Sequence, residues 1–127
     1  MKAIHYEEIS SAPVDMEGSS GCRIRCLIGP DDGAPSFTMR QFEVAPGGYT
    51  PKHSHAYEHE VFVLEGSGCV LDSRGEHPLR AGSVVFVAPQ EVHQFRNTGA
   101  GPLKFLCLIP HPLRGMAGTC VAACACD

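Results

Sequence analysis

Glycine and proline recur at short intervals along this 127-residue chain and constrain its fold more than any other feature. The 14 glycines and 10 prolines gather in clusters such as GPDDGAPS, APGG and NTGAGP, which separate short runs rich in Val, Phe, Leu and Ile. No stretch of about ten residues keeps a helical period without one of these helix breakers. The pattern predicts an all-β sandwich or barrel, with strands over residues 22–28, 37–44, 50–55, 59–65, 68–72, 76–79, 83–88, 92–97 and 103–109.

Length and composition predict one globular domain over residues 1–127, with its core at about 22–110. Residues 1–21 are expected to form a loosely held arm or an edge strand, and residues 111–127 a cysteine-rich tail. Basic residues are scattered and the net charge is −4, which argues against a nucleic-acid groove. No apolar run approaches the roughly 18 residues of a membrane span, and the first residues do not resemble a signal peptide. A cytoplasmic protein is therefore expected.

The seven cysteines fall into two groups. Cys22, Cys26, Cys69 and Cys107 lie in apolar, strand-like runs and are interpreted as buried thiols. The other three crowd into the tail sequence GTCVAACACD, at Cys120, Cys124 and Cys126. Two interpretations of the tail remain open, a soft-metal or redox site and an appendage without a role in the fold.

Four of the seven histidines predict a metal site. His53, His55 and His59 stand in HSHAYEHE, and His93 follows in PQEVHQFRN. In an extended strand His53 and His55 share a face about 6.6 Å apart, a spacing from which two imidazoles can converge on one ion. Because a straight strand would carry His59 about 20 Å from His53, a turn through residues 56–58 must fold it back. His93 then approaches from a strand distant in sequence.

These histidines admit two other interpretations. His55, Glu58 and His59 spell H-x-x-E-H, the inverted zinc-protease signature, which requires a helix. Pro51 upstream and the β-forming run VFVL downstream oppose a helix there. Alternatively the histidines merely decorate a strand end, but burying four imidazoles without an ion or carboxylates to organise them would be costly.

Two segments resemble the motifs of the cupin superfamily. The stretch Gly47-x5-His53-Ser-His55-x3-His59, followed by VFVLEG, is similar to the first motif, with His59 where the family usually has a glutamate ligand. The stretch from Gly82 through Pro89 and His93 is similar to the second motif. Glu91 replaces a usual glycine, and one extra residue separates Gly82 from Pro89. Glu60 could also serve as the acidic ligand, but it would face the opposite side of the strand from His59.

Over residues 22–110 the chain resembles the small single-domain bacterial cupins that hold manganese with four histidines. The resemblance implies a jelly-roll barrel, the cupin-type double-stranded β-helix, with the metal inside its mouth, and a homodimer made by sheet pairing. By the Irving–Williams order an all-nitrogen site prefers copper, nickel or zinc. We expect manganese or ferrous iron as the working ion, in line with the resemblance, with nickel or zinc as alternatives.

Alternation along the strands predicts the residues around the ion. Lys104 should face solvent, which turns Phe105 and Cys107 inward, and Phe95 shares a face with His93. Arg40 is in phase with apolar neighbours, and an inward arginine would anchor a substrate carboxylate. The alternative for each residue is ordinary core packing or, for Arg40, a solvated face.

Two functions remain open. A divalent ion held by four neutral imidazoles keeps its full charge and would attract anionic or enolisable oxygen ligands at its open positions. This favours a metal-dependent enzyme, an oxygenase acting on a diketone, enol or related small molecule. The absence of a convincing general acid or base among the inward positions favours instead a non-catalytic cupin that binds a small ligand or senses metal.

Overall fold

The computed structural model describes residues 1–110, and β-strands dominate this part of the chain. Its nine strands are β1 (Ala12–Pro13), β2 (Ser20–Ile28), β3 (Phe37–Tyr49), β4 (His59–Glu65), β5 (Ser67–Asp72), β6 (Gly75–Arg80), β7 (Val84–Val87), β8 (Gln94–Asn97) and β9 (Leu103–Pro110). Two 3-10 turns, η1 (Tyr6–Glu8) and η2 (Pro30–Asp32), are the helical elements of residues 1–110. The all-β prediction is confirmed. The predictions for the tail, including Cys120, Cys124 and Cys126, lie outside the described residues.

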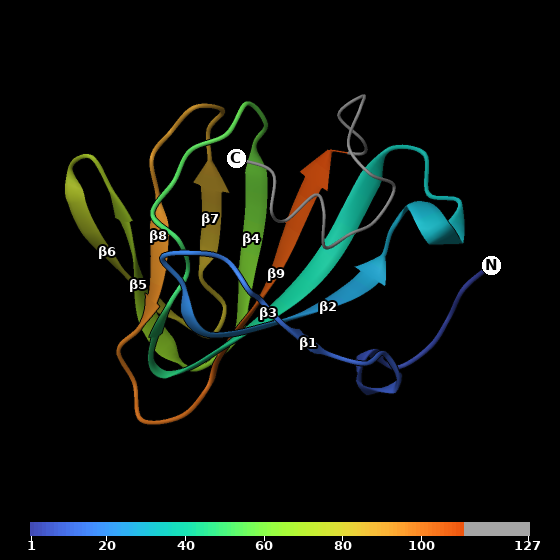
Figure 1. The fold of residues 1–127 in the computed structure, drawn as a ribbon, viewed down its shortest axis with the longest axis horizontal. Helices are drawn as coiled ribbons and strands as arrows, with labels where there is room; N and C mark the ends of the chain where they lie inside the picture. The colour runs from blue at the N-terminus through green and yellow to red at the C-terminus, as the bar shows by residue number, and fades with distance from the viewer. Residues whose placement is uncertain (111–127) are drawn as a thin grey trace.

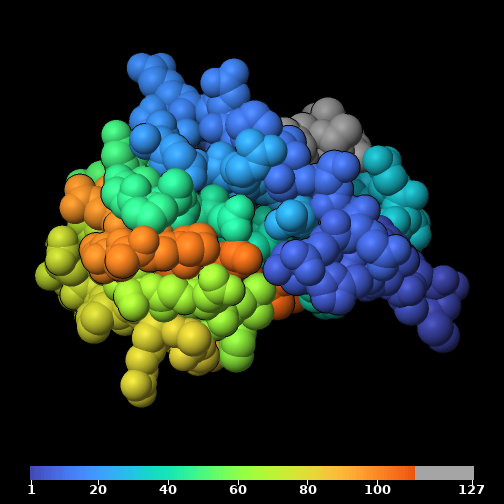
Figure 2. Space-filling model, turned by 90° about the horizontal axis from the view of Figure 1, so that it is seen from below, coloured from blue at the N-terminus to red at the C-terminus, as the bar shows by residue number. Residues whose placement is uncertain are grey.

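The strands form one curled antiparallel sheet in the order β6-β5-β8-β3-β9-β4-β7, with β2 and β1 added beside β3. The curl lets strands far apart in sequence enclose a common interior (Figure 1). In the space-filling view the orange β9 region lies between the blue-green β3 and the light green β4 (Figure 2). The barrel therefore brings histidines from both halves of the sequence to one place.

The core follows from side-chain alternation on the two long strands. On β3 the buried residues include Arg40, Phe42 and Val44, and on β9 every second side chain from Leu103 to Ile109 is buried. Phe42 pairs with Phe105 in the register, and their rings stack with centroids 5.3 Å apart. These apolar side chains share the inner face of the curled sheet, and their burial favours the curl.

The prediction of a strand over residues 50–55 is wrong. This segment is a loop that makes one isolated bridge, between His53 and His93, while the preceding strand β3 runs on to Tyr49. Pro51 has no N–H to contribute to a strand ladder, which explains why the pairing stops here. The histidines of HSHAYEHE are therefore held by a loop and by the start of β4.

Two details of the sequence interpretation change at the edges of the fold. The strand β1 pairs with β2, so part of the N-terminal arm is an edge strand, one of the two options expected. Cys22, Cys69 and Cys107 are buried thiols, as predicted. Cys26 is half-buried and disulfide-bonded, so its interpretation as a buried thiol is wrong.

Candidate metal centre

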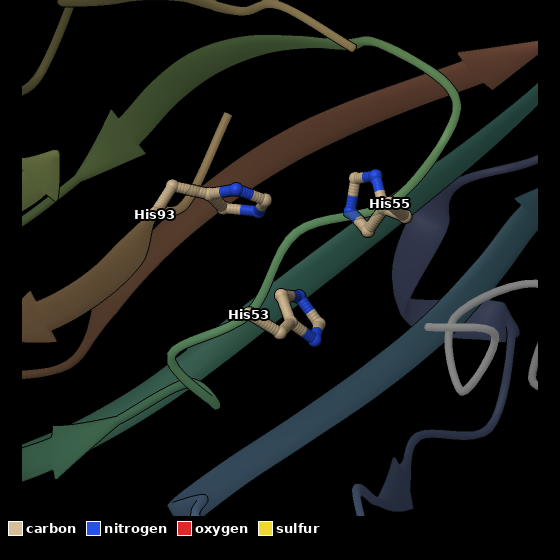
Figure 3. Close-up of side chains that lie close together, drawn as sticks. All are labelled: His53, His55 and His93. Atoms are coloured by element: carbon tan, nitrogen blue, oxygen red, sulfur yellow. The ribbon is translucent and has the colours of Figure 1, made fainter. Parts of the chain in front are cut away.

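The structure brings four imidazole rings together inside the curl of the sheet. Ring centroids are 5.1 Å apart for His53 and His55, 5.1 Å for His53 and His93, and 5.0 Å for His55 and His93. One ring nitrogen from each of these three lies within 4.8 Å of the others. Figure 3 shows the three side chains around a common space, with His53 and His55 on one loop and His93 on the segment opposite. Three neutral imidazoles at this spacing can hold a divalent metal.

His59, at the first position of β4, lies beside this group of three. Its ring centroid is 4.3 Å from that of His55 and 5.2 Å from that of His93, and its Nε2 lies 2.5 Å from the Nε2 of His55. The turn predicted through residues 56–58 is present as a bend that returns the chain to the cluster. Two ring nitrogens this close repel each other unless they share a proton or both bind one cation, so the contact is compatible with a bound cation.

Main-chain carbonyls orient two of the rings. Nδ1 of His55 donates to the carbonyl oxygen of Tyr57 at 3.0 Å, and Nδ1 of His93 donates to that of Glu91 at 2.8 Å. A carbonyl oxygen only accepts, so the proton must sit on Nδ1 in both rings. Each Nε2 then presents a lone pair toward the cluster, which is the form that binds metal.

Side chains orient His59 instead. Its Nδ1 lies 2.8 Å from Sγ of Cys107 and 3.3 Å from Nη2 of Arg40, and Nη2 of Arg40 donates to the same sulfur at 3.1 Å. All three side chains are buried, and Arg40 is only 1% exposed. The ring that enters from β4 is thus held by residues of β3 and β9.

Burial favours the neutral form of the His55 and His59 rings. Burial lowers the pKa of His55 to about 4, although its hydrogen bond to the Tyr57 carbonyl opposes the shift. Burial and then the Arg40 guanidinium lower the pKa of His59 far below the ordinary histidine value. Because a metal competes with protons for imidazole, neutral rings at pH 7 favour metal binding.

A pocket adjoins the cluster, and its wall contains all four residues that alternation had pointed inward, Arg40, Phe95, Phe105 and Cys107. The Phe95 and Phe105 rings stack with centroids 4.8 Å apart, which continues the stack from Phe42. The pocket wall therefore combines stacked phenylalanine rings with a guanidinium and imidazoles.

Sequence reasoning missed several contributors to this site. Val14 and Met16 of the N-terminal arm line the pocket, and no spacing in the sequence links the arm to the histidines. The Tyr57 ring stacks on His55 with centroids 4.1 Å apart and planes 5° from parallel. Phe42 also lines the pocket, and its phase with Arg40 could have indicated it.

Other candidates lie away from the cluster. Glu60 is exposed, as expected for the face of β4 opposite His59. The run from His55 to His59 is a loop that leads into a strand, so the helix needed by the inverted zinc-protease motif is absent here. His5 and His77 are exposed, and His77 contacts Asp72 at 3.0 Å.

Comparison with known proteins identifies the family. The cupin domain matches residues 40–109, more than half of the chain, and the chain therefore belongs to the cupin superfamily. A solved polyketide cyclase, RemF from Streptomyces resistomycificus, is 31% identical, with a TM-score of 0.82 over 97% of this chain and 90% of that one. The curled sheet described above is thus the jelly-roll barrel that the sequence predicted.

The curated relatives of this chain include proteins named for binding and proteins named for biosynthesis. Auxin-binding protein 1 of Arabidopsis thaliana is 30% identical over 118 residues, which cover 82% of this chain and 58% of that protein. The tetracenomycin polyketide synthase protein TcmJ of Streptomyces glaucescens is 29% identical over 116 residues, 87% of this chain and 76% of that protein. The chain spans less than two thirds of the length of the first curated relatives it matches. Within residues 1–110, no helix has the length and apolar character needed to cross a membrane.

Proposed function

We propose that this cupin is a metal-dependent enzyme that acts on enolisable β-dicarbonyl compounds and promotes ring closure of a polyketide-like chain. The observation that carries the proposal is the position of the four imidazoles, which converge at a pocket with a stacked aromatic wall and a buried guanidinium. The similarity to RemF, a polyketide cyclase, supports the choice of substrate class and reaction. The similarity to TcmJ, a polyketide synthase protein, supports the substrate class.

His53, His55, His59 and His93 would hold the metal. When bound, a divalent ion supplies Lewis-acid polarisation of carbonyl and enolate oxygens. Manganese follows the resemblance noted in the sequence, whereas an all-nitrogen donor set has a higher intrinsic affinity for nickel or zinc. We propose manganese as the working ion, and elemental analysis of protein purified without added metal tests it against iron, nickel and zinc.

The pocket residues fit such a substrate. The stacked rings of Phe42, Phe105 and Phe95 line the pocket and offer apolar contacts to a conjugated chain. The buried Arg40 guanidinium places a fixed positive charge beside the imidazoles and favours a substrate that is an anion or an enolate. The methylene between two carbonyls loses its proton readily, so this substrate class demands little from a general base in the pocket.

The experiment compares three functions in one set of reactions. Protein loaded separately with Mn²⁺, Fe²⁺, Ni²⁺ or Zn²⁺ is incubated with a linear poly-β-ketone, and cyclised product is followed by absorbance and mass while dissolved oxygen is recorded. The proposal predicts metal-dependent cyclisation without oxygen consumption. Metal-dependent oxygen uptake would contradict the proposed cyclase and would favour instead the oxygenase that the sequence analysis describes.

A second candidate is a binding protein, which the similarity to auxin-binding protein 1 favours. It predicts that the same β-ketones bind, as measured by calorimetry, yet emerge unchanged with every metal. That result would contradict the proposed enzyme.

We further propose that the protein is a homodimer. Phe62, Leu64, Val84 and Phe86 are exposed on the outer face of the paired strands β4 and β7, and Val84 is 76% exposed. Lys104, farther along this face, is paired with Glu43 at 3.4 Å and Glu65 at 3.8 Å. Glu60 is also exposed on this face, beside Phe86, but the four large apolar side chains make it mainly apolar, which fits a second copy of itself. Sedimentation should show a dimer that Phe86→Glu converts to a monomer. A monomeric wild-type protein would contradict it.

A further inference from the structure

The outer nitrogen of His59 is held differently from those of the other rings whose Nδ1 contacts are described above. His55 and His93 use main-chain carbonyls, but Nδ1 of His59 meets a thiol sulfur at 2.8 Å and a guanidinium nitrogen at 3.3 Å. One of these two neighbours, Cys107 or Arg40, must determine which ring nitrogen of His59 carries the proton.

Donor and acceptor chemistry answers it. For Nε2 of His59 to offer a lone pair to an ion, the ring proton must sit on Nδ1, and Nδ1 must donate. A guanidinium has five N–H donors and no acceptor, so Arg40 cannot receive that proton. The sulfur of Cys107 can, because it already accepts a hydrogen bond from Arg40 at 3.1 Å. Contact with Arg40 alone would instead favour the proton on Nε2, the form that cannot bind metal.

We propose that Cys107 is a positioning residue that holds His59 in its metal-binding tautomer, with Arg40 orienting the sulfur as an acceptor. This inference rests on the metal site of the proposed function.

The fold places this sulfur rigidly. Cys107 is 3% exposed on β9, where it pairs with Arg40 of β3 on one side and with Val61 of β4 on the other. Ladder hydrogen bonds on both flanks fix the backbone, so the acceptor cannot drift away from the ring. Loss of an outer hydrogen-bond partner of a metal ligand typically costs about 10–100-fold in metal affinity.

The proposal makes a specific coupling prediction. A carboxylate ligand has no second ring nitrogen to satisfy, so a glutamate at position 59 would not need Cys107. The cost of removing the sulfur should therefore depend on the residue at position 59, which a general packing role for Cys107 would not produce.

The test measures Zn²⁺ affinity by competition with a fluorescent chelator, without any substrate. Cys107→Ala should weaken binding by about 10–100-fold, and Cys107→Ser, whose hydroxyl also accepts, should recover most of it. Cys69→Ala is the matched control, because Cys69 is also a buried thiol but lies on β5 outside the pocket. It should bind Zn²⁺ as the wild type does. In a His59→Glu background, Cys107→Ala should cost nothing.

Equal loss in the His59 and His59→Glu backgrounds would overturn the proposal, as would full affinity in Cys107→Ala. A measurement on the unmutated protein covers the case in which Cys107→Ala does not fold. Nitrogen-15 NMR of the Zn²⁺-loaded protein should show His59 protonated at Nδ1, and protonation at Nε2 would overturn the assignment. A wild-type protein that binds no Zn²⁺ would overturn both this inference and the proposed function, whereas wild-type binding with an indifferent Cys107 would overturn the inference alone.

Discussion

His55 and His93 are oriented by the main chain, whereas His59 is oriented by the side chains of Arg40 and Cys107. A carbonyl acceptor is present whatever residue stands at its position, so the first arrangement tolerates substitution around it. The second arrangement depends on the identity of two residues from other strands. The difference teaches that one side of this candidate site is fixed by the fold, while the other side can be altered by single substitutions.

The largest effect should come from removing a ring. His93→Ala and His59→Ala should each weaken metal binding by more than about 100-fold, beyond the typical cost of losing an outer partner. Equilibrium dialysis followed by elemental analysis measures this. If only one of the two variants lost the metal, the two sides would not belong to one site.

Metal addition should stabilise the fold. A ligand that binds only the folded state adds about 2.7 kcal/mol at a concentration 100 times its dissociation constant. Thermal unfolding with and without Mn²⁺ should show this increase for the wild type and for the Cys69→Ala control. In His93→Ala the increase should disappear, and its persistence would place the ion elsewhere.

Acidification should lower the stability of the metal-free protein through both His55 and His59. Burial lowers the pKa of His55 to about 4 and that of His59 further, while in the unfolded chain both titrate near 6.5. Below pH 6.5 the unfolded state therefore binds more protons than the folded state, and the metal-free protein should lose stability as pH falls from 6.5 through about 4, with the His59 contribution continuing to lower pH. Its stability should be complete above pH 6.5.

Urea unfolding of the metal-free protein at several pH values checks this direction. Because both rings stay neutral below pH 6.5, release of bound metal should have its midpoint below that value. Stability that rises on acidification would contradict burial of neutral rings, and metal affinity that does not fall even below pH 4 would contradict histidine ligation.

The smallest effect should come from a side chain on the main-chain side of the site. Glu91 orients His93 through its carbonyl oxygen, and its carboxylate instead accepts from the Ala88 N–H at 3.2 Å. Glu91→Ala should leave metal affinity almost unchanged, in contrast with Cys107→Ala. A loss as large as that of Cys107→Ala would remove the distinction between the two sides.

The sequence predicted what depends on period and spacing. The alternation of side chains along a strand correctly predicted that Phe105 and Cys107 face the interior of the barrel. The rise per residue of a strand predicted that the chain must turn before His59, and it does. The sequence pattern wrongly predicted a strand over residues 50–55, because alternate residues such as His53 and His55 looked as if they shared one face of a strand. Pro51, which has no N–H for a strand ladder, argued against that strand.

The contacts of Arg40 and Cys107 with Nδ1 of His59 could not be predicted from the sequence, for a different reason. Arg40 and Cys107 are 67 positions apart, and they meet His59 only because β3, β9 and β4 are neighbours in the sheet. The position of Val14 and Met16 at the pocket depends in the same way on how the arm packs. Both features follow from strand order, which the chain's local patterns do not encode.

The central claim is that imidazoles from two separate stretches of the chain hold a single ion. Anomalous diffraction from crystals grown with Mn²⁺, recorded on both sides of the manganese absorption edge, tests it most directly. We predict one peak about 2.1–2.2 Å from a ring nitrogen of each of His53, His55, His59 and His93, a typical metal–imidazole distance. The absence of a peak, with the four rings surrounding only solvent, would contradict the account.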